Sequence, residues 1–184
     1  SYTGIDYMRL IAALLIVTIH TSPLSSYTET GDFILTRIIA RIAVPFFFMT
    51  SGFFLISRYN DKPERLKTFI KRTCAIYAAA IVIYLPINVY NGYFEISGLM
   101  PKLLKDILID GTLYHLWYLP ASVTGAVIAW YFVRRMGYKK AMAAALLLYL
   151  IGLFGDSYYG IVDNVPYLGT FYDLIFQVTD YTRN

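Results

Sequence analysis

The chain has 184 residues, of which 58% are hydrophobic, 17% aromatic and only 15% charged. Ordinary soluble domains carry about 25% charged residues. This composition excludes a disordered chain, and the mean hydropathy of +0.53 leaves too little polar surface for a soluble domain. The net charge is only +4, and the single cysteine excludes an internal disulfide and a zinc site. We therefore expect a membrane protein without a metal site.

Five stretches are long and apolar enough to cross a bilayer core of about 30 Å as helices. The fifth is short, and Lys139 and Lys140 can extend it by reaching toward the interface. A further apolar segment begins at 171–178. The sequence thus predicts an all-α, polytopic bundle of transmembrane helices. The five predicted spans are residues 5–21, 33–56, 73–90, 116–133 and 141–154.

Lys and Arg gather in two predicted loops. Residues 58–72 contain six of them and residues 134–140 contain four, together ten of the 16 in the chain. The connections 22–36 and 155–170 contain none. Because cytoplasmic loops carry an excess of Lys and Arg, we expect the N-terminus and both basic loops on the cytoplasmic side of a bacterial plasma membrane.

The connection between the third and fourth spans contains a helical pattern over residues 99–109. Its apolar residues recur at the spacing of one helix face. We expect an amphipathic helix that lies on the outer membrane surface. The apolar residues are Leu99, Leu103, Leu104, Ile107 and Leu108.

Arg9 and His20 are ionisable residues in or beside the first span. They are eleven residues apart, so at ~100° per residue they point to nearly the same side of a helix, roughly 16 Å apart along its axis. Charged residues inside a membrane are costly and usually face the bundle interior. The plain alternative places Arg9 at the cytoplasmic interface and His20 at the outer interface.

The second span contains Arg37 and Arg41, which at this spacing share one helix face near the outer end. Their predicted role is to bind an anion or to orient a substrate, and the alternative is that they reach to the interface. Pro45 is expected to disturb this helix. The run Thr50-Ser51-Gly52 supplies hydroxyls and allows close backbone approach, which more often serves packing than chemistry.

His115 and Trp117 lie at the outer end of the fourth span. A histidine beside aromatic residues is most often an interface residue, although a neutral imidazole can act as a general base near pH 7. Cys74 begins the third span without an evident partner. We interpret it as structural.

These motifs, taken together, resemble the membrane acyltransferase-3 family. The resemblance rests on the Arg9 to His20 spacing, the aromatic run that ends in Ser-Gly-Phe at 51–53, the basic loop, and His-Leu-Trp-Tyr-Leu at 115–119. The amino-acid sequence resembles even more strongly the membrane half of membrane-bound serine racemases from vancomycin-resistance clusters. Residues 1–184 would then be the first half of an acyltransferase-3 domain of about ten helices.

The resemblance implies transfer of an acyl group, such as acetyl, from cytoplasmic acyl-CoA to a hydroxyl acceptor of the cell envelope outside. His20 would be the essential base or acyl-relay residue, and Arg9 would help to hold the donor. Many members carry a second arginine where this chain has Ala75. The remaining candidates for binding of substrate or donor are Arg37, Arg41, Ser51, Lys71, Arg72, His115 and Trp117.

Two other functions stay open. Ala75 and the closer resemblance favour a module that supplies L-serine to a racemase, and the plain alternative is a membrane anchor. Pyridoxal phosphate would bind only in a racemase domain outside this chain. Besides that domain, we expect the lipid bilayer and small molecules as partners, and no nucleic acid.

Overall fold

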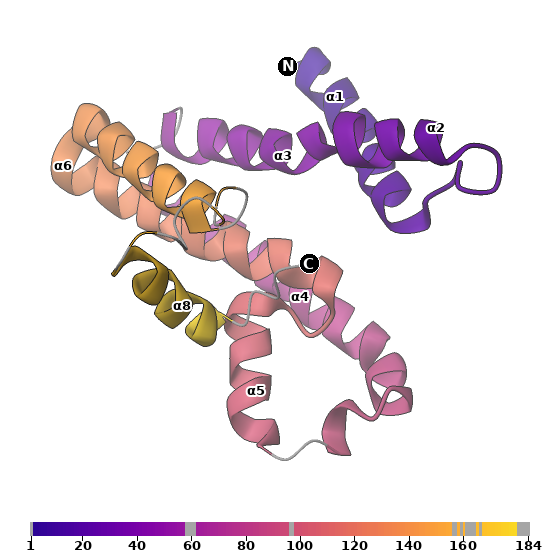
Figure 1. The fold of residues 1–184 in the computed structure, drawn as a ribbon. Coiled ribbons are helices and arrows are strands. Elements are labelled where there is room, and N and C mark those ends of the chain that lie inside the picture. Colours follow the sequence, from indigo (N-terminus) through magenta and orange to yellow (C-terminus); the bar gives the residue numbers. More distant parts are fainter. Residues whose placement is uncertain are drawn as a thin grey trace. The chain divides into compact units, whose positions relative to one another are not determined.

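The computed structural model describes residues 2–57, 62–95, 98–155, 158, 160, 165 and 167–179, without the side chains of residues 57, 114, 155 and 175–179. Every regular element in this described part is helical, which confirms the all-α prediction (Figure 1). The chain divides into two compact units, Ser1–Lys62 and Pro63–Asn184. We describe each unit by itself.

The first unit pairs two helical runs. Helix α1 spans Thr3–Thr21 and ends at Ser22, whose left-handed backbone turns its N–H onto the Thr18 carbonyl. The second run begins after Thr28, whose side chain accepts a hydrogen bond from the Gly31 N–H as a helix N-cap. Its elements are α2 (Glu29–Phe33), the π-helix η1 (Ile34–Ile39), the 3₁₀-helix η2 (Ala40–Ile42), α3 (Ala43–Gly52) and the π-helix η3 (Phe53–Ser57).

Two of the irregular elements in this run, η1 and η2, precede Pro45, which lies in the first turn of α3. Proline has no N–H to donate, and its ring clashes with the carbonyl four residues earlier, here that of Arg41. The run departs from α-geometry at this point and changes to π- and 3₁₀-turns. The predicted disturbance of the second span is therefore confirmed.

Small residues form the contact between α1 and the second run. Ala12, Ala40 and Ala43 are 2%, 0% and 0% exposed, and α1 packs against η1, η2 and α3. Their small side chains let the helix backbones approach closely, as in other membrane helix pairs.

The second unit is built on the long helix α4 (Pro63–Tyr90), which packs against α6. Proline is well suited to the first helical position, because the N–H that it lacks would have no partner there. Residues 58–72 were predicted to form a basic loop. This prediction is wrong for residues 63–72, because they belong to α4. Its other elements are η4 (Tyr93–Glu95), α5 (Leu99–Lys105), η5 (Asp106–Asp110), η6 (Tyr114–Trp117), α6 (Tyr118–Gly155) and α8 (Leu168–Thr179).

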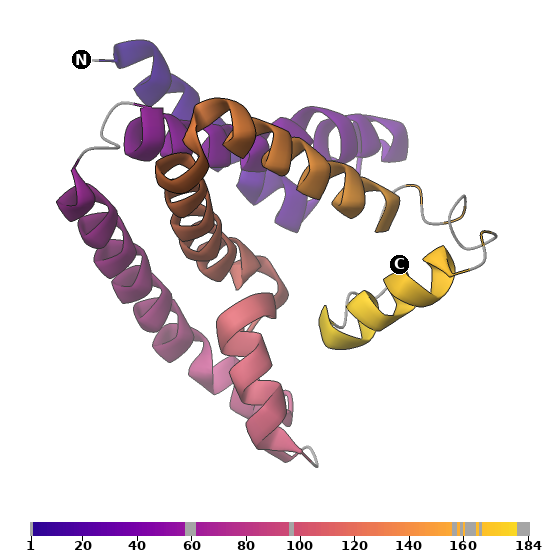
Figure 2. The same cartoon turned by 90° about the vertical axis from the view of Figure 1, so that its left-hand side faces the viewer.

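Helix α6 contains both the fourth and the fifth predicted spans and is broken at Gly137 (Figure 2). Gly137 has φ 75° and ψ 166°, a conformation that is essentially restricted to glycine. It separates an arm of residues 118–136 from an arm of residues 138–155. The expected basic loop at 134–140 is thus reduced to one non-helical residue. The Arg134 guanidinium lies over the Trp130 ring, and the Arg135 guanidinium lies over the Tyr131 ring.

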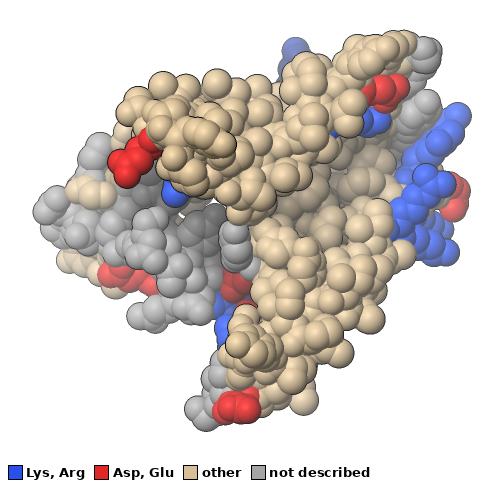
Figure 3. Space-filling view, turned by 90° about the vertical axis from the view of Figure 1, so that its right-hand side faces the viewer, with Lys and Arg blue, Asp and Glu red and all other residues tan. Residues whose placement is uncertain are grey.

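Four helical runs in the described part are long and apolar enough to cross a membrane: Thr3–Thr21, Glu29–Ile56, Pro63–Tyr90 and His115–Phe154. Large apolar side chains are exposed along all four, Leu14 at 61% and Ile83 at 71% among them. Figure 3 shows a face on which uncharged residues dominate and charged residues occur in small groups. Such a surface matches a hydrocarbon environment better than water.

Candidate functional site

Arg9, the first predicted site residue, is held from two sides. Its guanidinium lies 3.2 Å from the Asp6 carboxylate on the same helix and 5.2 Å from the centre of the Phe54 ring. The Phe54 ring in turn makes edge contacts with Tyr2 and Phe53. Because 42% of the Arg9 side chain stays exposed, the guanidinium is fixed in position but can still reach a ligand.

His20 lies in the last turn of α1 and is exposed. The helix runs without interruption from Thr3 to Thr21, so the regular geometry that places Arg9 and His20 on one side of it is present. The catalytic role of His20 stays a prediction.

The other predicted residues of the first unit lie on the second run. Arg37 is in η1 and Arg41 is in η2, and both are exposed. The turns between them are not α-helical. Regular α-helix geometry therefore does not place the two arginines on one helix face, as was expected from their spacing of four. Ser51 is half-buried in α3, and the neighbouring Thr50 hydroxyl donates to the Phe47 carbonyl at 3.1 Å.

An apolar cavity of about 150 Å³ lies between α1 and the second run. It is next to the helix turn that carries Arg9, because Met8 is part of its wall. Carbon-rich side chains line it: Met8, Ala12, Leu15, Ile42, Ala43, Phe46 and Met49.

The remaining predicted residues belong to the second unit. Lys71 and Arg72 are exposed on the first half of α4. His115 and Trp117 lie in η6, where the His115 ring meets the edge of the Tyr84 ring at 5.0 Å between centroids. The predicted site residues therefore form two sets, one in each unit.

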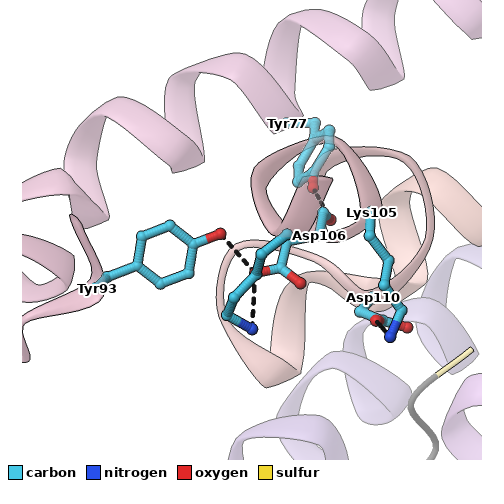
Figure 4. Close-up of polar contacts among 6 residues, drawn as sticks. Tyr77, Tyr93, Lys105, Asp106 and Asp110 are labelled. Carbon is cyan, nitrogen blue, oxygen red and sulfur yellow. Dashed lines mark hydrogen bonds and ion pairs between the residues drawn. The ribbon is translucent and has the colours of Figure 1, made fainter. Parts of the chain in front are cut away.

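A polar cluster around Asp106 was not predicted from the sequence (Figure 4). The Asp106 side chain is 8% exposed, and one of its oxygens accepts a hydrogen bond from the Tyr93 hydroxyl at 2.5 Å and lies 3.4 Å from the Lys102 ammonium. Its backbone carbonyl accepts hydrogen bonds from the Tyr77 hydroxyl at 3.2 Å and from the Gly111 N–H at 2.6 Å. Residues from α4, η4 and α5, together with Gly111 just after η5, thus converge on one aspartate of η5.

Burial and the hydrogen bond to Asp106 raise the pKa of the Tyr93 hydroxyl above its usual range. Tyr93 consequently stays neutral and continues to donate to the carboxylate at alkaline pH. A second ion pair joins Lys105 to Asp110 at 3.5 Å (Figure 4). Its five-residue spacing matches the π-turn geometry of η5.

The backbone turns sharply just after this cluster. Gly111 has φ 82°, and a Cβ atom built on it would lie 2.6 Å from the Trp117 nitrogen and 2.8 Å from the Leu116 carbonyl carbon. Only glycine allows the backbone at residue 111 to come this close to the backbone of residues 116 and 117. The following residue, Thr112, is 6% exposed, and its hydroxyl has no hydrogen-bond partner among the described residues.

One signal for the Asp106 cluster was present in the sequence. Residues 102–110 carry two lysines and two aspartates inside an otherwise apolar helical pattern. A spacing of four residues, as between Lys102 and Asp106, brings opposite charges together on a helix. The partners Tyr77 and Tyr93 are distant in sequence, and no local pattern identifies them.

Comparison with known proteins agrees with the membrane architecture. A family model described as an acyltransferase domain matches residues 2–179. Two relatives from Enterococcus faecalis, each named amino-acid racemase, are 67% and 41% identical over 100% and 98% of this chain. A serine/alanine racemase from Enterococcus gallinarum is 38% identical over 98% of it.

The chain spans 26% of the length of each of these relatives. No solved structure matches it. The family match covers nearly the whole chain, including both units and all four candidate spans. This chain therefore belongs to the acyltransferase-3 family and is an acyltransferase-type membrane domain.

Proposed function

We propose that this domain takes part in transfer of an acyl group from cytoplasmic acyl-CoA to a hydroxyl group on the outer side of the plasma membrane. The observation that carries the proposal is the acyltransferase family match over residues 2–179. His20, exposed at the end of α1, is the proposed base or acyl relay, and Arg9 is the proposed donor-binding residue.

In the reaction, the acceptor hydroxyl gives its proton to the neutral His20 imidazole while its oxygen attacks the thioester carbonyl. The new C–O ester bond forms, the C–S bond breaks, and coenzyme A leaves as a thiolate that takes up the proton. Arg9, held between Asp6 and Phe54 roughly 16 Å along α1 from His20, is the proposed contact for another part of the donor.

Each unit, taken by itself, has features that suit a part of the donor. The cavity of about 150 Å³ next to Arg9 has apolar walls that suit a short acyl group. The exposed cations Lys71 and Arg72 on α4 suit the phosphates of coenzyme A. Ala75, one turn further along α4, stands where many members of the family carry a second arginine.

The test uses membranes that contain the full-length protein and acetyl-CoA labelled in the acetyl group. We expect labelled acetyl in the envelope fraction, a large loss with His20→Ala, and little change with Thr21→Ala. Thr21 is the matched control because it lies in the same helix turn and its hydroxyl donates to the Val17 carbonyl of the same helix at 3.0 Å. Equal transfer by wild type and His20→Ala would refute the assigned role.

The racemase relatives favour a second candidate, in which the domain supplies L-serine to a racemase domain of the same protein. Cells that express the membrane part without a racemase domain should then take up labelled L-serine faster than cells with an empty vector. Equal uptake, together with equal D-serine output with and without the membrane part, would instead identify a membrane anchor.

A further inference from the structure

The inner end of the α5–η5 helix lies beside the middle of α4, not beside its end. Tyr77 is at the midpoint of α4 (Pro63–Tyr90), about 20 Å of helix rise from either end. Its hydroxyl bonds to the Asp106 carbonyl. A cavity of about 200 Å³ also shows that η5 lies beside the middle of α4. Its walls include Thr73 and Tyr77 of α4 together with Ile107 and Leu108 of η5.

The chain therefore reverses after α4 and runs back along it. Helix α5 starts at Leu99, nine residues after the end of α4, and the segment reaches the Tyr77 hydroxyl at Asp106 (Figure 2). After the turn at Gly111, α6 continues beside the first half of α4, with Leu119 and Val123 in the same cavity wall as Thr73. The α5–η5 segment, the turn and the first arm of α6 form one discontinuous helix antiparallel to α4.

The distribution of side chains on α5 and η5 is that of a helix in lipid. The apolar residues Met100, Leu104 and Leu108, spaced by four, are exposed at 66%, 55% and 64%. The opposite side carries Asp106, which is buried. A helix that lies on a membrane surface instead turns its charged face to water.

The charges of this segment are also neutralised in pairs. All four charged residues between 99 and 110 lie in an ion pair, Lys102 with Asp106 and Lys105 with Asp110. Charges facing water need no partner, whereas charges at membrane depth are costly unless they are paired. Irregular backbone at that depth is tolerated where protein covers it, and Gly111 and Thr112 are both buried.

We propose that α5 and η5 form the first part of a discontinuous transmembrane helix, which enters the bilayer beside α4 and carries the turn at residues 111–117 to the depth of Tyr77. This proposal does not depend on the acyl-transfer chemistry. It replaces the expectation that residues 99–109 lie flat on the membrane surface, which becomes the alternative outcome of the test.

The test measures the depth of spin labels in the full-length protein reconstituted in phosphatidylglycerol–phosphatidylcholine vesicles. Cysteines are placed singly at residues 100, 104 and 108 in a Cys74→Ser background, because Cys74 is exposed. Depth comes from the ratio of collision rates with oxygen, which enriches in lipid, and with a water-soluble nickel chelate. All three replaced side chains are more than half exposed, so the labels fit without repacking.

Two positions on α4 serve as depth standards: Ile76, beside Tyr77 and 61% exposed, and Tyr90, at the helix end and 90% exposed. We expect residue 108 to lie ~12 Å deeper than residue 100, from eight residues at the helical rise, with residue 104 between them. Residue 108 should match residue 76, and residue 100 should lie closer to residue 90. Equal depths at 100, 104 and 108, or greater access of the nickel chelate at 108 than at 100, would overturn the proposal.

Discussion

Replacing Gly111 with alanine tests how strictly the turn after η5 depends on glycine. Gly111 holds φ at 82°, which L-residues rarely adopt, and the added Cβ would lie 2.6 Å from the Trp117 nitrogen and 2.8 Å from the Leu116 carbonyl carbon. Both neighbours are backbone atoms, so no flexible side chain can move away to make room. The turn itself must open.

The cost has two parts. A non-glycine residue in such a backbone conformation costs about 1–3 kcal/mol, and forcing extra atoms into a packed site costs about 1–3 kcal/mol more. We therefore expect Gly111→Ala to lower the free energy of unfolding by about 2–6 kcal/mol. Gly125→Ala is the matched control, because Gly125 lies in α6 with nothing within 4 Å of its added Cβ. Alanine there should be neutral or stabilising by up to about 1 kcal/mol.

The assay is unfolding in mixed micelles of increasing SDS content, followed by fluorescence of the two tryptophans, of which Trp117 is adjacent to the affected turn. The Gly111→Ala transition should shift to a clearly lower SDS fraction than those of wild type and Gly125→Ala. A Gly111→Ala protein within about 0.5 kcal/mol of wild type, the range of an ordinary surface substitution, would refute this reasoning.

Three further predictions use the same assay. Asp106→Asn should destabilise by about 3 kcal/mol, since it removes a carboxylate that is 8% exposed and lies against Lys102 and Tyr93. Asp110→Asn should cost under about 1 kcal/mol, since the Asp110 side chain is 30% exposed. Equal losses would contradict a special role for the buried carboxylate. Tyr93 has a raised pKa in the folded state, so its contribution to stability is complete below pH ~10 and is lost as pH rises above the pKa of the unfolded state. Tyr93→Phe should therefore lose less stability than wild type between pH 9 and 11, and parallel curves would argue against this pKa shift. Phe54→Leu should cost about 1 kcal/mol by removing the ring under the Arg9 guanidinium, and no change would show that this contact contributes nothing.

Hydrophobic length identified most of the helices but not their ends. The first span, predicted at 5–21, is α1 at Thr3–Thr21, because apolar length and helix length coincide there. The third span, predicted at 73–90, begins ten residues earlier at Pro63. Residues 63–72 are too charged to register as a span, yet they are good helix formers. Polarity therefore marks where the apolar segment ends, not where the helix ends.

The candidate site was less predictable than the helices. Arg9 stands out locally as a cation in an apolar segment, and its contact with Phe54 comes from another helical run. The helix over residues 99–109 was predicted correctly, but the pattern could not show that its apolar residue Leu108 is exposed while Asp106 is buried. That choice depends on Tyr77 and Tyr93, which approach Asp106 only after α4 and α5 have packed together.

The break at Gly137 makes α6 intolerant of changes in length. Only one non-helical residue joins its two arms. The connection therefore has no further loop residues that could rearrange to accommodate an insertion. One extra residue beside Gly137 would rotate every side chain of the second arm by ~100° relative to the first. The exposed side chains of Leu146 and Leu147, for example, would then point in a different direction. Insertions in this family member should accordingly be tolerated in its connections and rejected at this turn, although the turn carries no proposed chemistry.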